Sequence, residues 1–577
     1  MTIAKERKQN LFITFYDVAK AYDNADVHNM LYIIWQAGVR GKIWRLLKNM
    51  STNLTAVVKT RYGLSRAIKR ENGGRQGSRL TGRLFAKQMD TLCEQFINAT
   101  TTVSSAITSV PAAAATTAAV TLAPPITATT RTVTSKPATV TIETASTPAT
   151  KTTTTTTATT VTPEAIQIGF EIEKNFNIGC LEFVDDALSC AVGITNQEST
   201  LKKVDEFARA NKLEWGESKC EVMQVGAKVN VPQTWPLGEK NIKNTTAYKY
   251  LGDMVTNDNK NKQNLIIKEN KLQQIIRNIN TTASSDIMHG IETKVILALF
   301  DKCALTGFLS NSESWTLTIS EEKEVDKIGI QAAKRLFNLP TTTPSVAVIY
   351  SLGLLYTTQS IDQRKLMYLH KVLNRNGDNW TTKMLYYLQR QNTGWAKNIC
   401  DKLNEYILEP DWEKIKGQTK KQWKDLVGKA IEDKNKEKLL SNCTTTTPQG
   451  IKINTKTIHI HNSLTTTTHK RKPLREIIDQ NKQKTKTIIL ARNGMLECGK
   501  NFKGTMKDVC QECNKIDDEE HRLNDCKTWN EMNNVGKTRV DFTDIYSEDV
   551  DVLKRVIDVI ENVWELKYAN GKMKRMQ

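Results

Sequence analysis

Apolar and polar positions alternate along the first part of the chain in a way that predicts short strands and amphipathic helices in turn. Residues Leu11 to Tyr16 form an apolar run of strand character that ends at Asp17. Apolar positions then recur at helical spacing, at Met30, Leu31, Ile34 and Trp35. An amphipathic stretch over 41–49 and a strand-like stretch over 54–62 come next. The pattern therefore predicts a mixed α+β fold for this part of the chain.

A second strand-like run, 179–190, contains two adjacent aspartates, Asp185 and Asp186. Burying a charge is costly unless it is paired or holds a metal, so we expect a tight hairpin with both side chains at its tip. Carboxylates placed in this way suit Mg²⁺, although a polar turn between two strands is the more common reason for such a pair. Asp17 is well placed to be a third carboxylate. The alternative for Asp17 is a helix N-cap, and for Asp23 the N-cap is the favoured interpretation.

Between these two strands lies a glycine-rich turn, 72–85, that is followed by helical sequence. Its glycines permit close approach of the backbone, and the side chains of Arg75 and Gln76 can hydrogen-bond a base or a phosphate. A turn of this kind is a weak signal when it occurs alone.

Three of these features, in this order, resemble the palm motifs of the reverse transcriptases of non-LTR (LINE-type) retrotransposons: Asp17 with 20–23, the turn over 73–77, and 183–186. The resemblance implies an α+β fold with a right-hand polymerase palm, a helical thumb, a mostly helical and basic C-terminal region and a small zinc knuckle. It identifies the metal-binding carboxylates, which would hold two Mg²⁺ ions, as Asp17, Asp185 and Asp186.

The same resemblance gives expectations for the residues around the carboxylates. Tyr22 matches the aromatic gate that excludes a ribonucleotide 2′-hydroxyl, and the nucleotide- and template-binding turn comprises Arg75, Gln76 and Gly77. Lys219 matches the catalytic lysine that assists departure of pyrophosphate. Residues 248–252 match the primer-grip hairpin, and the helical region that contains 312–315 and reaches about Leu373 is similar to the thumb.

The palm is interrupted by a tract of Thr, Ala, Val, Ser and Pro over 99–163. Such a tract lacks the large apolar residues that would offset the entropy of chain ordering, so we expect it to be disordered. The expected divisions are a first part of the palm at 1–98, the insert at 99–163, a second part of the palm at 164–258, the thumb at 259–375, a basic helical region at 376–500, a zinc knuckle at 501–530 and a C-terminal helix at 531–577.

Near the C-terminus, four residues have the spacing C-x2-C-x7-H-x4-C: Cys510, Cys513, His521 and Cys526. Four soft ligands joined by short loops predict a closed tetrahedral zinc site, and a chance cluster of reduced cysteines is the alternative. After it, apolar residues at helical spacing predict a final amphipathic helix. The three tryptophans of the basic helical region, Trp395, Trp412 and Trp423, are expected to be core residues rather than stacking platforms.

The net charge and the composition limit the expected class of binding partner and the expected cellular location. The chain has 577 residues and a net charge of +20, from 82 basic and 62 acidic residues, which favours a polyanionic partner over a membrane. The most apolar long stretch, 295–309, is interrupted by Asp301 and Lys302, and Met1 to Asn10 is too polar for a signal peptide. We therefore expect an intracellular protein of the nucleus or cytoplasm, without a membrane segment.

The function expected from the resemblance is RNA-directed DNA polymerisation on an RNA template with a DNA primer and deoxynucleoside triphosphates. Because only 16 residues precede Asp17, the fingers are expected to be largely missing. The chain also departs from the family at Arg79, at Thr81-Gly82, at Val184 and at Glu182. The alternative is therefore a catalytically inactive, truncated remnant that acts only as a zinc-containing nucleic-acid-binding protein.

Overall fold

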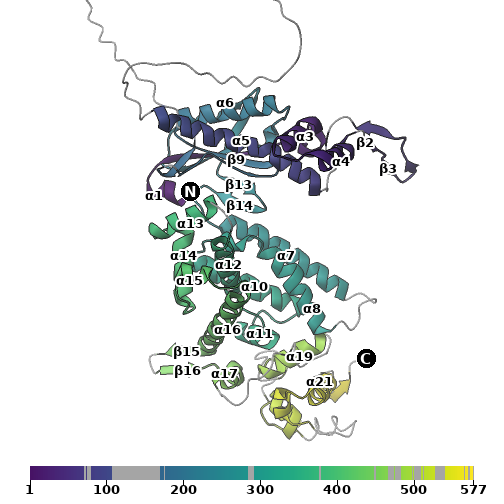
Figure 1. Cartoon of the computed structure of the whole chain (residues 1–577). Coiled ribbons are helices and arrows are strands. Elements are labelled where there is room, and N and C mark those ends of the chain that lie inside the picture. Colours follow the sequence, from purple (N-terminus) through teal and green to yellow (C-terminus); the bar gives the residue numbers. More distant parts are fainter. Residues whose placement is uncertain are drawn as a thin grey trace, which may run out of the picture. The chain divides into compact units, whose positions relative to one another are not determined.

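The computed structural model describes residues 1–106, 169–283, 292–465, 474, 482–496, 498, 509–510, 513–526, 540–564, 566–569 and 572–575, with short gaps at 53, 71–72, 74–78, 175, 376–378 and 448–449. The chain forms two compact units. The N-terminal unit is Lys8–Thr245, and the C-terminal unit combines Met1–Arg7 with Thr246–Gln577. Figure 1 labels the elements of both.

A mixed six-stranded sheet is the centre of the N-terminal unit, with strand order β11-β12-β10-β1-β9-β8. β10 and β12 pair in parallel, whereas the other neighbours are antiparallel. The strand bounds are β1 Asn10–Asp17, β8 Cys180–Phe183, β9 Asp186–Val192, β10 Glu221–Gly226, β11 Thr234–Leu237 and β12 Lys240–Thr245. The strand predicted over 11–16 is thus confirmed as β1, in an interior position of the sheet.

Helices α5 and α6 lie together on one face of this sheet (Figure 1). Phe12 and Tyr16 of β1 pack there in one core with residues of both helices, among them Phe85 and Phe207. The helices are α2 Ala21–Asn24, α3 Val27–Gln36, α4 Gly41–Ser51, α5 Arg79–Ala106 and α6 Ile194–Ala210. Small hairpins complete the unit, formed by β2 Leu54–Ala56, β3 Lys59–Thr60, β4 Gly63–Leu64, β5 Ile68–Arg70, β6 Phe170–Glu173 and β7 Phe176–Ile178.

Three expectations for the N-terminal unit need adjustment. The N-cap prediction for Asp23 is wrong, because Asp23 lies within α2. Asp26 caps α3 instead: its Oδ1 atom accepts hydrogen bonds from the backbone N–H groups of His28 and Asn29, at 2.9 and 3.1 Å. The strand expected over 54–62 is two short strands, β2 and β3. Helix α5 continues through 99–106, past the predicted start of the polar insert, and 107–163 lies outside the described residues.

The C-terminal unit is mostly helical, as predicted for 259–375 and for 376–500. It begins with a hairpin of β13 Ala247–Tyr250 and β14 Asp253–Thr256, which turns at Leu251 and Gly252, both at positive φ. Its helices are α1 Thr2–Glu6, α7 Lys262–Ala283, α8 Thr293–Leu299, α9 Thr306–Phe308, α10 Ile319–Leu336, α11 Ser345–Leu352, α12 Thr357–Leu373, α13 Trp380–Arg390, α14 Gly394–Glu405, α15 Trp412–Lys416, α16 Lys420–Cys443, α17 Ile458–Thr465, α19 Lys482–Arg492 and α21 Val550–Trp564. Short hairpins are formed by β15 Thr444–Thr447 with β16 Gly450–Ile453, and by β17 Leu566–Ala569 with β18 Lys572–Arg575.

Two apolar cores hold the described helices of this unit together. Trp412 and Trp423 are buried in one of them and Trp395 packs against it, so the prediction that these tryptophans are core residues is confirmed. The final amphipathic helix is α21, and its residues Leu553, Val556, Ile557 and Ile560 belong to the other core. None of the described helices has the length and apolar character needed to span a bilayer.

Candidate functional site

Asp17 is the last residue of strand β1 and lies at the edge of the apolar core. Every residue from Leu11 to Tyr16 is buried, so the strand is fixed on both faces and Asp17 is its first partly exposed position at this end. The antiparallel register of β1 and β9 places Asp17 directly opposite Asp186. The strand-end aspartate and one aspartate of the hairpin are therefore direct cross-strand neighbours.

The hairpin between β8 and β9 presents Asp185. Phe183 pairs with Asp186, so the turn consists of Val184 and Asp185. Val184 has a φ of 63°, a left-handed conformation that is strained for a β-branched side chain. Strain of this kind persists only where the surroundings determine the conformation, and it clusters at functional sites. The predicted tight hairpin is confirmed, with Asp185 in its turn and Asp186 as the first residue of β9.

A short loop before β10 brings a lysine to the aspartates. The N–H of Gly216 donates to the carbonyl oxygen of Asp17 at 2.8 Å, and a 3₁₀ turn, Glu217–Lys219, follows. The Nζ atom of Lys219 then lies 3.0 Å from Oδ2 of Asp17.

The local electrostatics are those of concentrated negative charge. The pKa of Asp186 is raised by burial and by the neighbouring carboxylates of Asp185 and Asp17. The pKa of Lys219 is raised by its hydrogen bond to Asp17 and by the surrounding aspartates. Asp185 and Asp186 form no ion pair with any described residue. Carboxylate oxygens with this unbalanced charge fit a hard divalent cation such as Mg²⁺.

Glu182, the extra acidic residue of the hairpin, points to a different cluster. The thiol of Cys93 donates to Oε2 of Glu182 at 3.6 Å. Burial and the adjacent Asp90 raise the pKa of Glu182 far above its ordinary value. This direction of the shift favours the neutral form of the Glu182 side chain beside the aspartates, which the sequence alone does not indicate.

The remaining residues expected at this site are only partly described. Tyr22 lies in helix α2, and its side chain is outside the described part of the structure. Arg75, Gln76 and Gly77 are also outside the described residues. The structure thus brings together Asp17, Asp185, Asp186 and Lys219 from three segments, namely the end of β1, the β8–β9 hairpin and the loop before β10.

The predicted zinc ligands converge in the C-terminal unit. The ligand atoms of Cys510, Cys513, His521 and Cys526 all lie within 4.8 Å of one another. The sulfur of Cys526 is 3.8 Å from that of Cys510 and 3.9 Å from that of Cys513. Two thiolates bound tetrahedrally at about 2.3 Å would be about 3.8 Å apart, so the cluster has the dimensions of a zinc site. Among the described residues it is the one group of this kind, and the three aspartates do not form such a tight group.

Local backbone structure explains how four ligands from one short segment meet. The N–H of Asn514 donates to the carbonyl of Cys510 at 2.9 Å, and Asn514 has a positive φ, which turns the chain after Cys513. A short π-helical turn, His521–Asp525, begins at the third ligand, and the N–H of Cys526 donates to the carbonyl of His521 at 2.9 Å. The cluster could hold a zinc ion, as the sequence spacing predicts.

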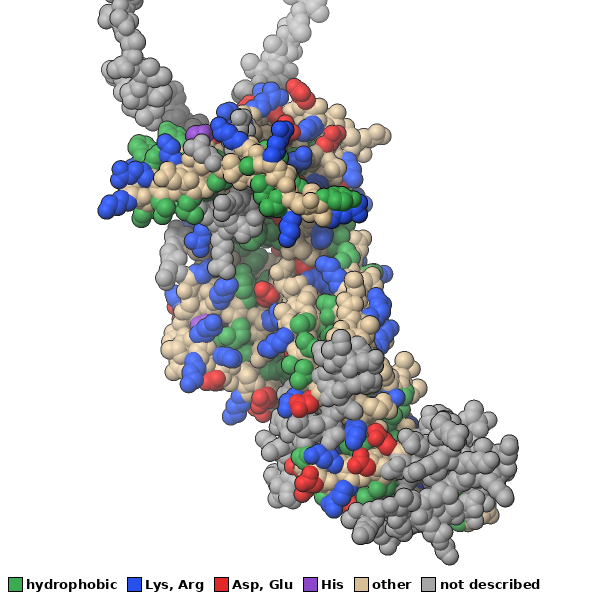
Figure 2. Space-filling model, turned by 90° about the vertical axis from the view of Figure 1, so that its right-hand side faces the viewer, with side chains coloured by type: hydrophobic (Ala, Val, Ile, Leu, Met, Phe, Trp, Pro, Cys, Tyr) green, Lys and Arg blue, Asp and Glu red, His purple; other side chains and the backbone are tan. Residues whose placement is uncertain are grey.

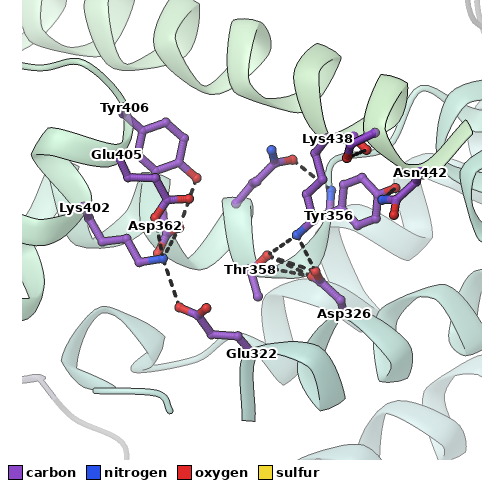
Figure 3. A network of polar contacts seen from close by, with 12 residues as sticks. Glu322, Asp326, Tyr356, Thr358, Asp362, Lys402, Glu405, Tyr406, Lys438 and Asn442 are labelled. Carbon is purple, nitrogen blue, oxygen red and sulfur yellow. Dashed lines mark hydrogen bonds and ion pairs between the residues drawn. The ribbon is translucent and has the colours of Figure 1, made fainter. Parts of the chain in front are cut away.

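A third polar cluster lines a cavity of about 1060 Å³ in the C-terminal unit, which none of the predicted site residues lines. Figure 3 shows the Lys402 side chain directed at three carboxylates. Its Nζ atom lies 2.9 Å from Glu322, 3.2 Å from Asp362 and 3.0 Å from Glu405. Beside it, Lys438 pairs with Asp326 at 2.6 Å. Because these charges pair with one another across α10, α12, α14 and α16, the network can fasten the helices together without a ligand.

No model of a known protein family matches this chain, and no curated protein matches it either.

Proposed function

We propose that this protein is an RNA-directed DNA polymerase of the non-LTR retrotransposon type. The observation on which the proposal rests is the cross-strand pair of Asp17 and Asp186, with Asp185 in the adjoining turn and Lys219 in contact with Asp17. A common polar turn would explain Asp185 and Asp186, but it would not explain a third carboxylate in register with them on the next strand.

The proposed reaction joins the primer 3′-oxygen to the α-phosphorus of a deoxynucleoside triphosphate and releases pyrophosphate. Bound Mg²⁺ ions would supply Lewis-acid activation of the 3′-hydroxyl and neutralise charge on the triphosphate. The chain itself fixes the carboxylates that would hold them: β1 orients Asp17, and the strained turn at Val184 orients Asp185. A rigid backbone matters here because misplacement by about 1 Å can cost about 100-fold in rate.

Lys219 has two roles in this proposal. In the ground state it forms an ion pair with Asp17 at 3.0 Å. Its side chain is 66 % exposed, so it can also move to the leaving pyrophosphate and stabilise the charge that develops there. The hairpin of β13 and β14 and the helices that follow it would act as primer grip and thumb.

The test is single-nucleotide extension of a DNA primer on an RNA template by the full-length protein. We expect extension only with Mg²⁺ and only of the nucleotide that the template specifies. Loss of a group that merely orients a metal ligand costs 10–100-fold, so Asp185→Asn, which removes a ligand, should reduce the rate by at least about 100-fold. Asp205→Asn is the matched control, because Asp205 lies in the same unit but pairs with Arg209 at 2.7 Å.

Absence of Mg²⁺-dependent extension from a folded, zinc-loaded preparation would overturn the proposal. Equal rates for wild type, Asp185→Asn and Asp205→Asn would overturn it as well, because the product would then come from another site or from a contaminant.

A second candidate function is favoured by the Cys/His cluster: a zinc-containing nucleic-acid-binding protein without polymerase activity. The observation in its favour is that the soft ligands already have the dimensions of a closed site. It predicts salt-sensitive RNA binding that survives Asp185→Ala but fails in Cys510→Ser. Extension activity in the wild type would exclude it as the sole function.

A further inference from the structure

The surface formed by α3, α4 and the β2–β5 hairpin has an unusual combination of exposed rings and cations; we call it the α3–α4 surface. Tyr32 is 55 % exposed, Trp35 is 44 % exposed and Tyr62 is 84 % exposed. No side chain of α4 is buried, although the helix is amphipathic. Aromatic rings of this size are usually covered in a folded protein, so their exposure needs a reason.

The same segment has only positive charges. From Val27 to Arg70 the sequence contains nine Lys and Arg residues and no Asp or Glu. Within the described part of the chain none of the basic side chains over 40–69 forms an ion pair. Figure 2 faces the side of the molecule on which these elements lie in Figure 1, and basic and apolar side chains are intermixed there.

The rings and the cations are arranged in contact with one another. The rings of Tyr32 and Trp35 are stacked, with centroids 6.4 Å apart and an angle of 13° between planes. The guanidinium of Arg40 lies 3.8 Å from the centre of the Trp35 ring. On α4, Nζ of Lys48 lies 5.3 Å from the centre of the Trp44 ring. Each indole of this surface, the exposed Trp35 and the partly buried Trp44, is thus accompanied by a cation.

A groove of about 350 Å³ runs between the two helices. It is lined by His28, Leu31, Tyr32, Trp35, Trp44 and Lys48. Four of these six side chains are aromatic or heteroaromatic rings, which suits a planar group better than a flexible alkyl chain. Cations at its margin suit an anion attached to that group.

We propose that the α3–α4 surface binds single-stranded nucleic acid, with bases stacked on Tyr32 and Trp35 and phosphates held by Arg40, Lys42 and Lys48. Aromatic platforms beside basic residues bind single strands in this way, with little dependence on sequence. The inference goes beyond the proposed polymerisation, because the surface contains none of the three aspartates and needs no catalysis.

The test measures binding of fluorescent oligouridylate to the full-length, zinc-loaded protein by anisotropy. One stacked base contributes enough that Trp35→Ala should weaken binding by about 10-fold, whereas Trp35→Phe should retain most of the affinity. Trp380→Ala is the matched control, since Trp380 is 47 % exposed on α13 in the C-terminal unit. Combined replacement of Arg40, Lys42 and Lys48 by Ala should lower the slope of log K against log salt by about 2, at about 0.7 per phosphate contact.

A second readout keeps the test independent of folding and of catalysis. Photocrosslinking of 4-thiouridine-containing oligouridylate should label residues 27–51, in the wild type and equally in Asp185→Asn. Unchanged affinity in Trp35→Ala together with crosslinks elsewhere would overturn the inference. Binding of phosphatidylserine vesicles without binding of oligouridylate would overturn it too, because the surface would then contact a membrane.

Discussion

Two clusters in this protein have the same ingredients, three carboxylates and one lysine, and use them in opposite ways. In the C-terminal unit Lys402 pairs with Glu322, Asp362 and Glu405, and only 9 % of its side chain is exposed. In the N-terminal unit Lys219 contacts Asp17 with 66 % of its side chain exposed. In the first cluster the lysine pairs with all three carboxylates, whereas in the second Asp185 and Asp186 form no ion pair among the described residues.

The difference indicates that the Lys402 cluster is structural, and it supports the proposal that the three aspartates of the N-terminal unit bind a cation. Burial alone would lower the pKa of Lys402, but the carboxylates around it raise the pKa above its ordinary value. At Asp186 burial and like charges act in the same direction and raise the pKa of the carboxyl group. A cluster whose charges are mutually stabilising holds the fold together, and one whose charges repel favours binding of a cation from solution.

The largest effect on stability should follow from removing Lys402, the lysine that pairs with Glu322, Asp362 and Glu405. Lys402→Met removes the cation that pairs with the buried carboxylate of Asp362 and should lower the free energy of unfolding by about 3–5 kcal/mol. Denaturant unfolding of the full-length protein measures this. Lys327→Met, at an exposed pair with Glu324, is the control and should change little. Equal stability of the two variants would show that the Lys402 network does not fasten the helices.

The pH dependence of stability offers a second contrast, at Lys365, a buried lysine of α12 that lies near Asp362 of the Lys402 cluster. Burial lowers the pKa of Lys365 to about 8 from an unfolded value of 10.5, partly offset by Asp362. Between these pH values the unfolded chain binds the additional proton, so wild-type stability should rise with pH relative to Lys365→Met, by up to about 3 kcal/mol. Thermal unfolding over this range, with Lys371→Met as a control on the same helix, measures the slope. A parallel pH dependence in all three proteins would contradict the assignment.

Replacement of an aspartate by asparagine should change the melting temperature in opposite directions in the two clusters. Asp186→Asn removes a repelled charge and should raise the melting temperature by roughly 1–2 °C at neutral pH without Mg²⁺. Because the folded-state pKa of Asp186 is raised, this gain should disappear on acidification, when the wild-type carboxyl is protonated in both states. Burial raises the pKa of Asp362 as well, but this carboxylate pairs with Lys402 and accepts a hydrogen bond from Tyr406, so Asp362→Asn should lower the melting temperature. Destabilisation by both substitutions would remove the distinction between the clusters.

The smallest expected effect is that of Lys219→Met on stability. An exposed ion pair of this kind contributes about 0–1 kcal/mol, so the melting temperature should hardly change. Primer extension should nevertheless slow, since the variant cannot stabilise the leaving pyrophosphate. Glu217→Gln, on the same 3₁₀ turn, is the matched control. A stability loss as large as that of Lys402→Met would show that Lys219 is structural.

The sequence predicted the parts of these sites that depend on local patterns. The strand ending at Asp17 follows from its continuous apolar run, and the hairpin at Asp185 from charge within an apolar segment. The Cys/His cluster was predictable because all four ligands lie within one short segment whose spacing fixes the geometry. In each case short-range chemistry determines the structure.

The parts that escaped prediction depend on long-range packing. The raised pKa of Glu182 arises from burial and from contacts with Asp90 and Cys93 on a distant helix, and no local pattern indicates those contacts. The Lys402 network joins residues of α10, α12 and α14, and each of its members alone looks like an ordinary surface charge. The Asp23 prediction failed because Asp23 and Asp26 are both plausible caps in sequence, and only the folded chain shows that Asp26 faces the free N–H groups of α3.

The proposal that Asp17, Asp185 and Asp186 hold divalent cations is tested most directly by counting bound Mn²⁺ ions, which substitute for Mg²⁺. The sample is the full-length, zinc-loaded protein with primer, RNA template and a non-reactive nucleotide. Electron paramagnetic resonance measures free and bound Mn²⁺. The account predicts bound Mn²⁺ in the wild type, loss of it in Asp17→Asn with Asp186→Asn, and retention in Asp205→Asn and in Cys513→Ser. Equal Mn²⁺ binding by the wild type and the double aspartate variant would contradict the account.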